Sequence, residues 1–207
     1  DDRGRRAEDR LMHPAIALLE FDSIAIGMHA GDAMVKRAPV EVTYAGTVHP
    51  GKYLVLVGGD VASVEESYGA GLTAGGDAVM DRIFLPSAHP DISRYLRGMR
   101  GRVTGEALGI IETTTVAATL GAADRGLKGA DVDLVELKLA DRLGGKAYCV
   151  FSGTLADAQA AVEIAVDNMV NPDNLVAQVV IPDFHDEMLA NLEAATEFSS
   201  RISGGRG

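Results

Sequence analysis

The sequence is short of the residue types that mark several functional classes. It has one cysteine, no tryptophan and 5% aromatic residues among its 207 residues. A single thiol forms no internal disulfide and cannot alone make a cysteine zinc site, which fits a reducing compartment. Proteins that stack bases on aromatic rings usually carry more of these rings. The composition therefore argues against a disulfide scaffold, a cysteine metal centre and a base-stacking protein.

Cations and long apolar runs are also scarce. There are 19 Lys and Arg against 30 Asp and Glu, a formal net charge of −11. A phosphate-tracking surface needs clustered cations, so we expect no nucleic-acid partner. No apolar run approaches the about 20 residues of a membrane span, so we expect no membrane partner. The first ten residues, DDRGRRAEDR, show no signal-peptide pattern. We predict a cytoplasmic protein with flexible tails at 1–13 and 199–207.

What the sequence does contain is one motif written twice. AIALLE at 15–20 and ALGIIE at 107–112 are apolar runs that end in Glu, 92 residues apart. At offsets that grow from 92 to 94 and then 96, further residues pair: Asp32 with Asp124, Lys36 with Lys128, Lys52 with Lys146, Gly59 with Gly153, Pro86 with Pro182 and His89 with His185. Three registers in chain order indicate a tandem duplication.

Each copy predicts the same order of elements, β-α-β-β-α-β followed by a short helix. In the first copy the pattern predicts a strand at 16–20, a helix from Ser23 to about Arg37, a strand from Val40, a turn at 46–51, a strand at 53–57, a helix after Asp60, a strand ending at Leu85, and a helix bearing Ile92, Leu96 and Met99. Thr154 is the equivalent helix cap in the second copy. This order predicts an α/β (α+β) fold of two ferredoxin-like domains, each a four-stranded antiparallel sheet with helices on one face.

The domain boundaries follow from the repeat. We predict a first domain at 14–100, a linker at 101–106 and a second domain at 107–198. Four arginines lie near the join: Arg94, Arg97, Arg100 and Arg102. We interpret them as a solvated helix face and linker rather than a partner site.

The residues offer no catalytic constellation. The glycine-rich strings at 58–60 and 143–146 lack the spacing of a phosphate or dinucleotide loop. His89 and His185 occupy equivalent places after proline, which favours helix starts over metal ligands. We therefore predict that the chain is not an enzyme and has no catalytic residues.

Two further residue types are interpreted as structural. Glu20 and Glu112 end the first strand of each copy, and nothing in the sequence places an acid–base partner beside either. A hydrogen-bonding role in the fold is favoured. Cys149 lies in the apolar string AYCVF. No neighbouring charge would stabilise a thiolate there, so we predict a buried, inert thiol.

Several motifs together resemble the bacterial microcompartment shell family. They are DAMVKRAPV at 32–40, the turn before Gly51-Lys52, the apolar strand that follows, GDV at 59–61 and P-x-x-H at 86–89. Two copies in one chain look like the tandem-domain, trimer-forming class. The resemblance implies a flat homotrimer shaped like a hexamer, set in a shell with hexameric and pentameric shell proteins.

The resemblance also implies sites. In this family the turn before the third strand faces a central pore for small metabolites. That assigns Val48, His49, Pro50 and Gly51, with Arg142, Leu143 and Gly144 in the second copy. It places Lys36 and Lys128 at the tile edge. Propanediol-type members hold an iron–sulfur cluster on a cysteine where this chain has His49. Thiolate is the usual cluster ligand, so we expect no cofactor and no metal here.

Three classes of function stay open at this stage. The first is a structural shell tile. The second is a pore-centred metal-binding or electron-transfer shell protein that uses His49, since three imidazoles on an axis can hold a metal. The third is a small-molecule-binding regulatory trimer, which would need a pocket with convergent polar groups.

Overall fold

The computed structural model describes residues 15–97, 99–140 and 142–193. The predicted tails at 1–13 and 199–207 lie outside these residues. Within the described part of the chain, no helix is long and apolar enough to cross a membrane.

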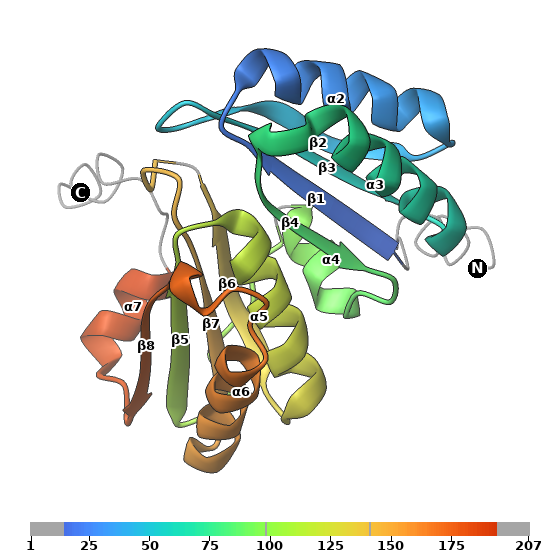
Figure 1. The fold of residues 1–207 in the computed structure, drawn as a ribbon. Helices are drawn as coiled ribbons and strands as arrows, with labels where there is room; N and C mark the ends of the chain where they lie inside the picture. Colours follow the sequence, from blue (N-terminus) through green and yellow to red (C-terminus); the bar gives the residue numbers. More distant parts are fainter. Residues whose placement is uncertain (1–14, 98, 141, 194–207) are drawn as a thin grey trace, which may run out of the picture.

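The chain repeats one set of elements (Figure 1). The first half contains β1 (Ala15–Phe21), α2 (Ile24–Arg37), β2 (Glu41–Val48), β3 (Lys52–Gly59), α3 (Val61–Gly75), β4 (Val79–Leu85) and α4 (Pro90–Leu96). The second contains β5 (Ala107–Thr113), α5 (Val116–Gly129), β6 (Asp133–Leu139), β7 (Ala147–Gly153), α6 (Leu155–Asp167), β8 (Leu175–Pro182) and α7 (Asp186–Glu193). A 3-10 turn precedes β4 and β8. The predicted order and duplication are confirmed.

Each half forms a four-stranded antiparallel sheet. The strand orders are β2-β3-β1-β4 and β6-β7-β5-β8. The registers match as well, because Ala15 faces Gly59 in the first sheet and Ala107 faces Gly153 in the second. Helices α2 and α3 cover one face of the first sheet, and α5 and α6 cover one face of the second (Figure 1). The predicted ferredoxin-like fold class is confirmed.

Helix starts follow the predicted caps. The side chains of Ser23, Asp60 and Thr154 each accept a backbone N–H from the first turn of the following helix. Such caps satisfy backbone donors that a helix leaves unpaired at its start. The local sequence therefore sets where α2, α3 and α6 begin.

Two details differ from the sequence-based expectation. The turn predicted at 46–51 is shorter, because Gly46 and Thr47 still pair with β3 and β2 runs on to Val48. Met99, predicted on the face of the terminal helix, lies beyond the end of α4 at Leu96.

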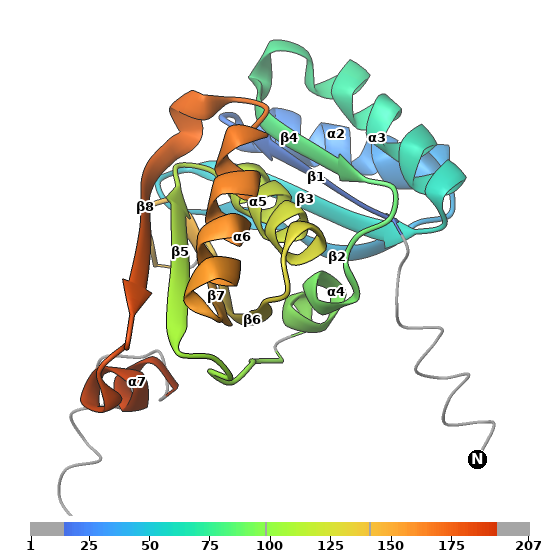
Figure 2. The same cartoon turned by 90° about the horizontal axis from the view of Figure 1, so that it is seen from below.

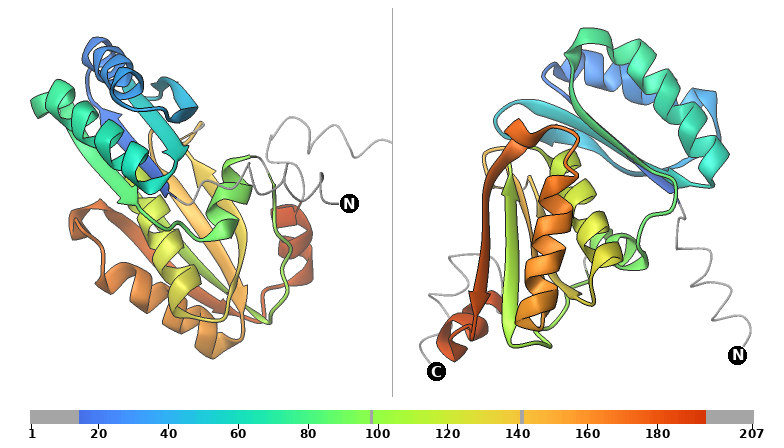
Figure 3. Two further views of the ribbon diagram at one scale, coloured as in Figure 1. Left: turned by 90° about the vertical axis from the view of Figure 1, so that its right-hand side faces the viewer. Right: turned by 60° about the horizontal axis from the view of Figure 1, so that its bottom comes forward.

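The alternating side chains of β1 serve two cores. Ala17, Leu19 and Phe21 pack with α2 and α3 of their own half. Ile16 and Leu18, on the opposite face, pack with α5 of the second half. Figures 2 and 3 show α5 lying along the first sheet. Every residue of β1 is buried, because the strand is covered on both faces.

The segment 101–106, predicted as a solvated linker, is fixed to the second half. Gly101 N–H donates to the Val135 carbonyl at 3.3 Å. The N–H groups of Thr104 and Gly105 both donate to Ser152 Oγ, at 3.1 and 2.9 Å. Arg100, expected on a solvated face, forms an ion pair with a carboxylate of β6. The segment therefore reaches β5 with three of its N–H groups bonded to the second half.

Candidate functional site

The two turns assigned to the pore lie side by side. One joins β2 to β3 and the other joins β6 to β7. A Cβ atom added to Gly145 in the second turn would lie 2.9 Å from the His49 carbonyl oxygen and 3.0 Å from Pro50 Cδ. Gly145 also has a φ of +84°, which disfavours any side chain. The structure thus brings the two turns together, while their place around a pore axis stays a prediction.

The first turn presents its tip to solvent. Val48 is buried, and His49, Pro50 and Gly51 are exposed. The N–H of Gly51 donates to the Val48 carbonyl at 2.9 Å, and the His49–Pro50 peptide bond is cis. The imidazole of His49 is therefore carried on a short, internally bonded turn.

The second turn is longer and differently built. Leu143 N–H donates to the Ala140 carbonyl and Lys146 N–H to the Leu143 carbonyl, at 3.1 and 3.2 Å. Arg142 and Gly144 are exposed, and Leu143 is half-buried. Arg142 and Gly144 both have positive φ angles, 60° and 63°. The copies therefore offer different groups at equivalent places, His49 in one and Arg142 in the other.

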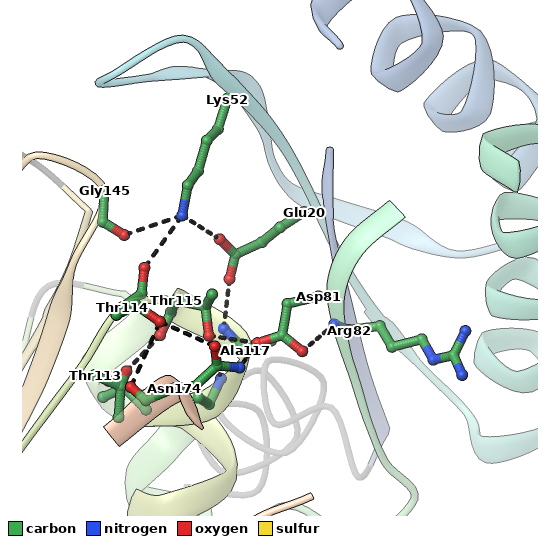
Figure 4. Close-up of polar contacts among 12 residues, drawn as sticks. Glu20, Lys52, Asp81, Arg82, Thr113, Thr114, Thr115, Ala117, Gly145 and Asn174 are labelled. Carbon is green, nitrogen blue, oxygen red and sulfur yellow. Dashed lines mark hydrogen bonds and ion pairs between the residues drawn. The ribbon is translucent and has the colours of Figure 1, made fainter. Parts of the chain in front are cut away.

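Lys52, directly after the first turn, ties that turn to the second half. Its Nζ donates to the Thr114 carbonyl at 3.2 Å and to the Gly145 carbonyl at 3.4 Å (Figure 4). The same Nζ lies 3.5 Å from Glu20 Oε2. One ammonium group thereby connects β1, the segment before α5 and the neighbouring turn.

Glu20 sits at the centre of the junction between the halves. Its side chain is fully buried, and Oε1 accepts the Ala117 N–H at 2.7 Å (Figure 4). Helix α5 has no acidic residue in its own first turn, so Glu20 supplies the carboxylate that suits a helix N-terminus. The predicted structural role of Glu20 is confirmed, and its partners come from both halves.

Burial dominates the electrostatics of Glu20. Desolvation raises its pKa to about 7, against the opposing effects of the Ala117 N–H and the Lys52 ammonium. The carboxylate of Asp81 adds to the rise. The pKa of this carboxyl group therefore lies close to neutral pH because the junction shields it from water.

A second polar cluster completes the junction. Asp81 of β4 accepts hydrogen bonds from the hydroxyl of Thr115 and from Asn174 Nδ2, the latter at 2.9 Å. Asp81 and Asn174 border a cleft between β4 and α5 that Arg125 also lines. Their polar groups are bonded to one another, which favours a structural role over ligand binding.

The second copy holds the same acid–lysine pair in an open setting. Lys146 Nζ lies 2.8 Å from Glu112 Oε1. The Glu112 side chain is 35% exposed, whereas that of Glu20 is 0% exposed. The two pairs are equivalent in sequence, so the difference reflects the helix that covers one and not the other.

The two lysines assigned to the tile edge have different surroundings. Lys36 pairs with Asp32 in its own helix at 2.5 Å, and its side chain is 73% exposed. Lys128 pairs with Asp124 at 2.6 Å and also donates to the Ser87 carbonyl of the first half at 2.5 Å. Lys128 thus helps to join the halves. The edge role of both lysines stays a prediction.

The histidines after proline lie at helix starts, as predicted. The Nδ1 atoms of His89 and His185 accept the N–H groups of Asp91 and Glu187, both at 3.3 Å. No group of three or more His, Cys, Asp and Glu among the described residues is placed to hold a metal ion.

Cys149 is the inert thiol that the sequence predicts. It is fully buried in β7, and desolvation raises its pKa to about 12. This is the single cysteine of the chain, and the first turn presents His49 instead. The residues of the turn therefore do not fit an iron–sulfur cluster held by thiolates.

The chain belongs to the BMC-domain family. The BMC domain matches it twice, over residues 15–88 and 107–184. Each span covers the sheet and the two long helices of one half and ends before its short terminal helix. The duplication and the paired turns are therefore features of a tandem BMC-domain protein.

Two similar proteins have names that refer to bacterial microcompartments or carboxysomes. The chain is 40% identical over 177 residues to the bacterial microcompartment shell protein PduT of Citrobacter freundii, covering 86% of this chain and 96% of that protein. It is 24% identical over 196 residues to the carboxysome assembly protein CcmO of a Synechocystis strain, covering 88% of this chain and 65% of that protein.

Solved structures agree. A microcompartment protein from Desulfitobacterium hafniense matches with a TM-score of 0.73 and 40% identity, over 84% of this chain and 97% of that one. A fused, permuted hexameric shell protein of the RMM microcompartment shares the fold, with a TM-score of 0.54 and 21% identity over 74% and 82% of the two chains. The present chain is a shell protein of a bacterial microcompartment.

Proposed function

We propose that the chain is a non-catalytic tile subunit that closes into a homotrimer around a metabolite pore. One observation carries the proposal. The halves are joined head to tail, so each half retains one open surface, and the two open surfaces match the two sides of the internal junction. Shell proteins of this family assemble with other shell proteins, and the trimer would be the unit that does so here.

The first open surface belongs to α2 and β2, and we call it the open helix face. Its apolar side chains are exposed, whereas the equivalent side chains of α5 and β6 are buried. The pairs are Ile24 at 39% and Val116 at 1%, Met28 at 54% and Leu120 at 0%, Val35 at 42% and Leu127 at 7%, and Val42 at 42% and Leu134 at 3%. The buried members pack in the shared core with the first half. Removal of such apolar surface from water is favourable and would stabilise a contact between copies.

The second open surface belongs to β5, β8 and α7, and we call it the open sheet face. It is formed by Glu112, Val179 and Met188, with the half-buried Ile110 beside them. The equivalent side chains of the first half, Leu18, Glu20, Ile83 and Ile92, pack in or against the shared core or bond to α5. Val179 and Met188 are 48% and 57% exposed. Each open position therefore has a covered counterpart 92 or 96 residues away.

Repeating the internal junction between copies would cover both surfaces. The open helix face of one copy would meet the open sheet face of the next, as α5 meets the first sheet within the chain. Such head-to-tail contacts form a ring when their rotation closes. Three copies supply six domains, the number that the family's hexagonal tile implies. The adjacent turns around Gly145 would then line the centre of the ring.

The pore would present His49 and Arg142 from each copy. Both are exposed at the tips of adjacent turns. These groups suit passage of small polar metabolites, and we expect no resident metal. Light scattering during gel filtration tests the trimer, and metal analysis of the same peak tests the pore. We expect three chains per particle and no zinc or iron beyond that of a His49→Ala variant. A single chain at micromolar concentration would reject the proposed function.

The tile edge is tested at Lys36. Its exposed amino group pairs within α2, so Lys36→Asp should cost the isolated chain less than about 1 kcal/mol. If the internal junction repeats between copies, Lys36→Asp removes one polar contact of that junction and leaves the apolar contacts of α2 in place. We therefore expect the variant to remain a trimer at micromolar concentration and to form sheets with a hexameric shell protein less readily, as seen in electron micrographs. A variant that loses the trimer instead would place Lys36 in the contact between copies, as its equivalent Lys128 is placed within the chain.

A further inference from the structure

The pair Glu112–Lys146 is one half of a repeated contact whose other half is not supplied by the described part of the chain. In the first copy, Glu20 and Lys52 bind the segment that leads into α5. Glu20 accepts the Ala117 N–H, and Lys52 donates to the Thr114 carbonyl. In the second copy the same acid and lysine face each other at 2.8 Å on the open sheet face. The junction around Glu20 therefore shows what Glu112 and Lys146 are shaped to hold.

We propose that Glu112 and Lys146 capture the first turn of α2 of the neighbouring copy, which rests on the trimer proposed above. The offset of 92 residues equates Ala117 with Ala25 and Thr114 with Asp22. Glu112 would accept the Ala25 N–H, and Lys146 would donate to the Asp22 carbonyl. The contact would join the start of α2 in one copy to the end of β5 in the next.

The start of α2 fits this role. Helix α2 has the same length as α5, 14 residues, and is capped in the same way, by Ser23 where α5 has Thr115. Neither helix has an acidic residue in its first turn. For α5 the acceptor comes from Glu20 across the junction. A carboxylate from the next copy would complete α2 in the same manner.

The apolar surroundings extend the match beyond the charges. Ile24 and Met28, in the first turns of α2, are exposed, and their counterparts Val116 and Leu120 are buried in the core that joins the halves. Ile110, one pleat from Glu112 on β5, corresponds to Leu18, which packs with α5. Glu112 therefore lies where a helix start with exposed apolar side chains would pack. Among the described residues, the start of α2 carries such side chains, and α2 of a second copy would supply them.

The capture is placed next to the pore turns. Lys52 also donates to the Gly145 carbonyl of the adjacent turn. The equivalent acceptor for Lys146, at an offset of 94 residues, is the Gly51 carbonyl of the neighbouring copy. Lys146 would thus hold the pore turns of two copies at a fixed distance from each other. Closure of the ring and the shape of the pore would then depend on the same contact.

The closing experiment compares Glu112→Ala with Glu66→Ala. Glu66 also pairs with a cation on the surface, Arg37, and its loss changes the net charge equally. We expect Glu112→Ala to raise the dissociation constant of the trimer at least about tenfold per contact, because a charge-assisted hydrogen bond is lost from a covered site. Glu66→Ala should leave it within about twofold. Mass photometry at nanomolar concentration measures both.

Folding is checked separately. Glu112→Gln keeps an acceptor oxygen and should weaken the trimer less than Glu112→Ala, with unchanged far-UV circular dichroism for both. If the wild type forms a trimer and Glu112→Ala changes its dissociation constant no more than Glu66→Ala does, the capture is overturned and the tile function stands. A wild-type chain that forms no trimer overturns both.

Discussion

Replacing Leu120 by aspartate is expected to prevent the chain from folding. Leu120 is fully buried in α5, in the core that joins the two halves. Truncating such a leucine alone costs about 3 kcal/mol, and an unpaired buried carboxylate adds several more. Domains of this size have only about 5–15 kcal/mol of stability. Circular dichroism should therefore show loss of native structure, and urea unfolding should lose its cooperative transition.

The matched substitution Met28→Asp is expected to have the opposite profile. Met28 occupies the equivalent position of α2 and is 54% exposed. The change in helix propensity is the same type in both helices, so a difference in outcome reports on packing. We expect a chain with native circular dichroism that elutes with the mass of one subunit, because the new carboxylate would be buried on closure of the ring.

The two outcomes separate the internal junction from the contact between copies. A Leu120→Asp chain that folds normally would show that α5 does not pack on the first sheet in solution. A Met28→Asp chain that still forms trimers at nanomolar concentration would remove α2 from the subunit contact. A double variant adds nothing to the first loss, since the chain is already unfolded.

The sequence predicts the fold well because the caps are local signals and because the two copies can be aligned with each other. Ser23, Asp60 and Thr154 each precede an apolar periodic segment, and each caps the helix expected of it. Comparing two copies also averages out ambiguity, since a strand seen weakly in one is seen again in the other. The end of the short terminal helix is predicted less well, because the apolar pattern continues to Met99 whereas α4 ends at Leu96.

The junction could be predicted only in part. The contact from Glu20 to Ala117 joins residues 97 apart and depends on how two domains dock. No local pattern contains that information. A signal did exist, because the acid that ends the first strand and the lysine that starts the third occur in both copies. Lys52 and Lys146 occupy equivalent positions of the repeat, yet their pairing with Glu20 and Glu112 follows only from the sheet register that sets β1 beside β3 and β5 beside β7.

The buried carboxyl of Glu20 should make stability fall as pH rises from about 4.5 to 7. Its pKa is about 7 in the folded chain, against an ordinary value of 4.5. Between these values the folded chain keeps a proton that the unfolded chain releases, so raising the pH favours unfolding. The slope approaches 1.4 kcal/mol per pH unit, a total of about 3 kcal/mol that is complete above pH 7.

Glu20→Gln isolates this effect, because glutamine keeps the acceptor for the Ala117 N–H and cannot ionise. The free energy of unfolding, measured by urea from pH 4.5 to 8, should fall for the wild type relative to the variant. The difference should grow by about 3 kcal/mol across this range, since other titrating groups are common to both chains. Lys52→Met removes an ammonium group that favours the charged carboxylate of Glu20. In this variant the pH at which the loss of stability is complete should therefore be higher than in the wild type. A difference that stays flat with pH would mean that Glu20 is solvated and that the junction of the two halves is open to water.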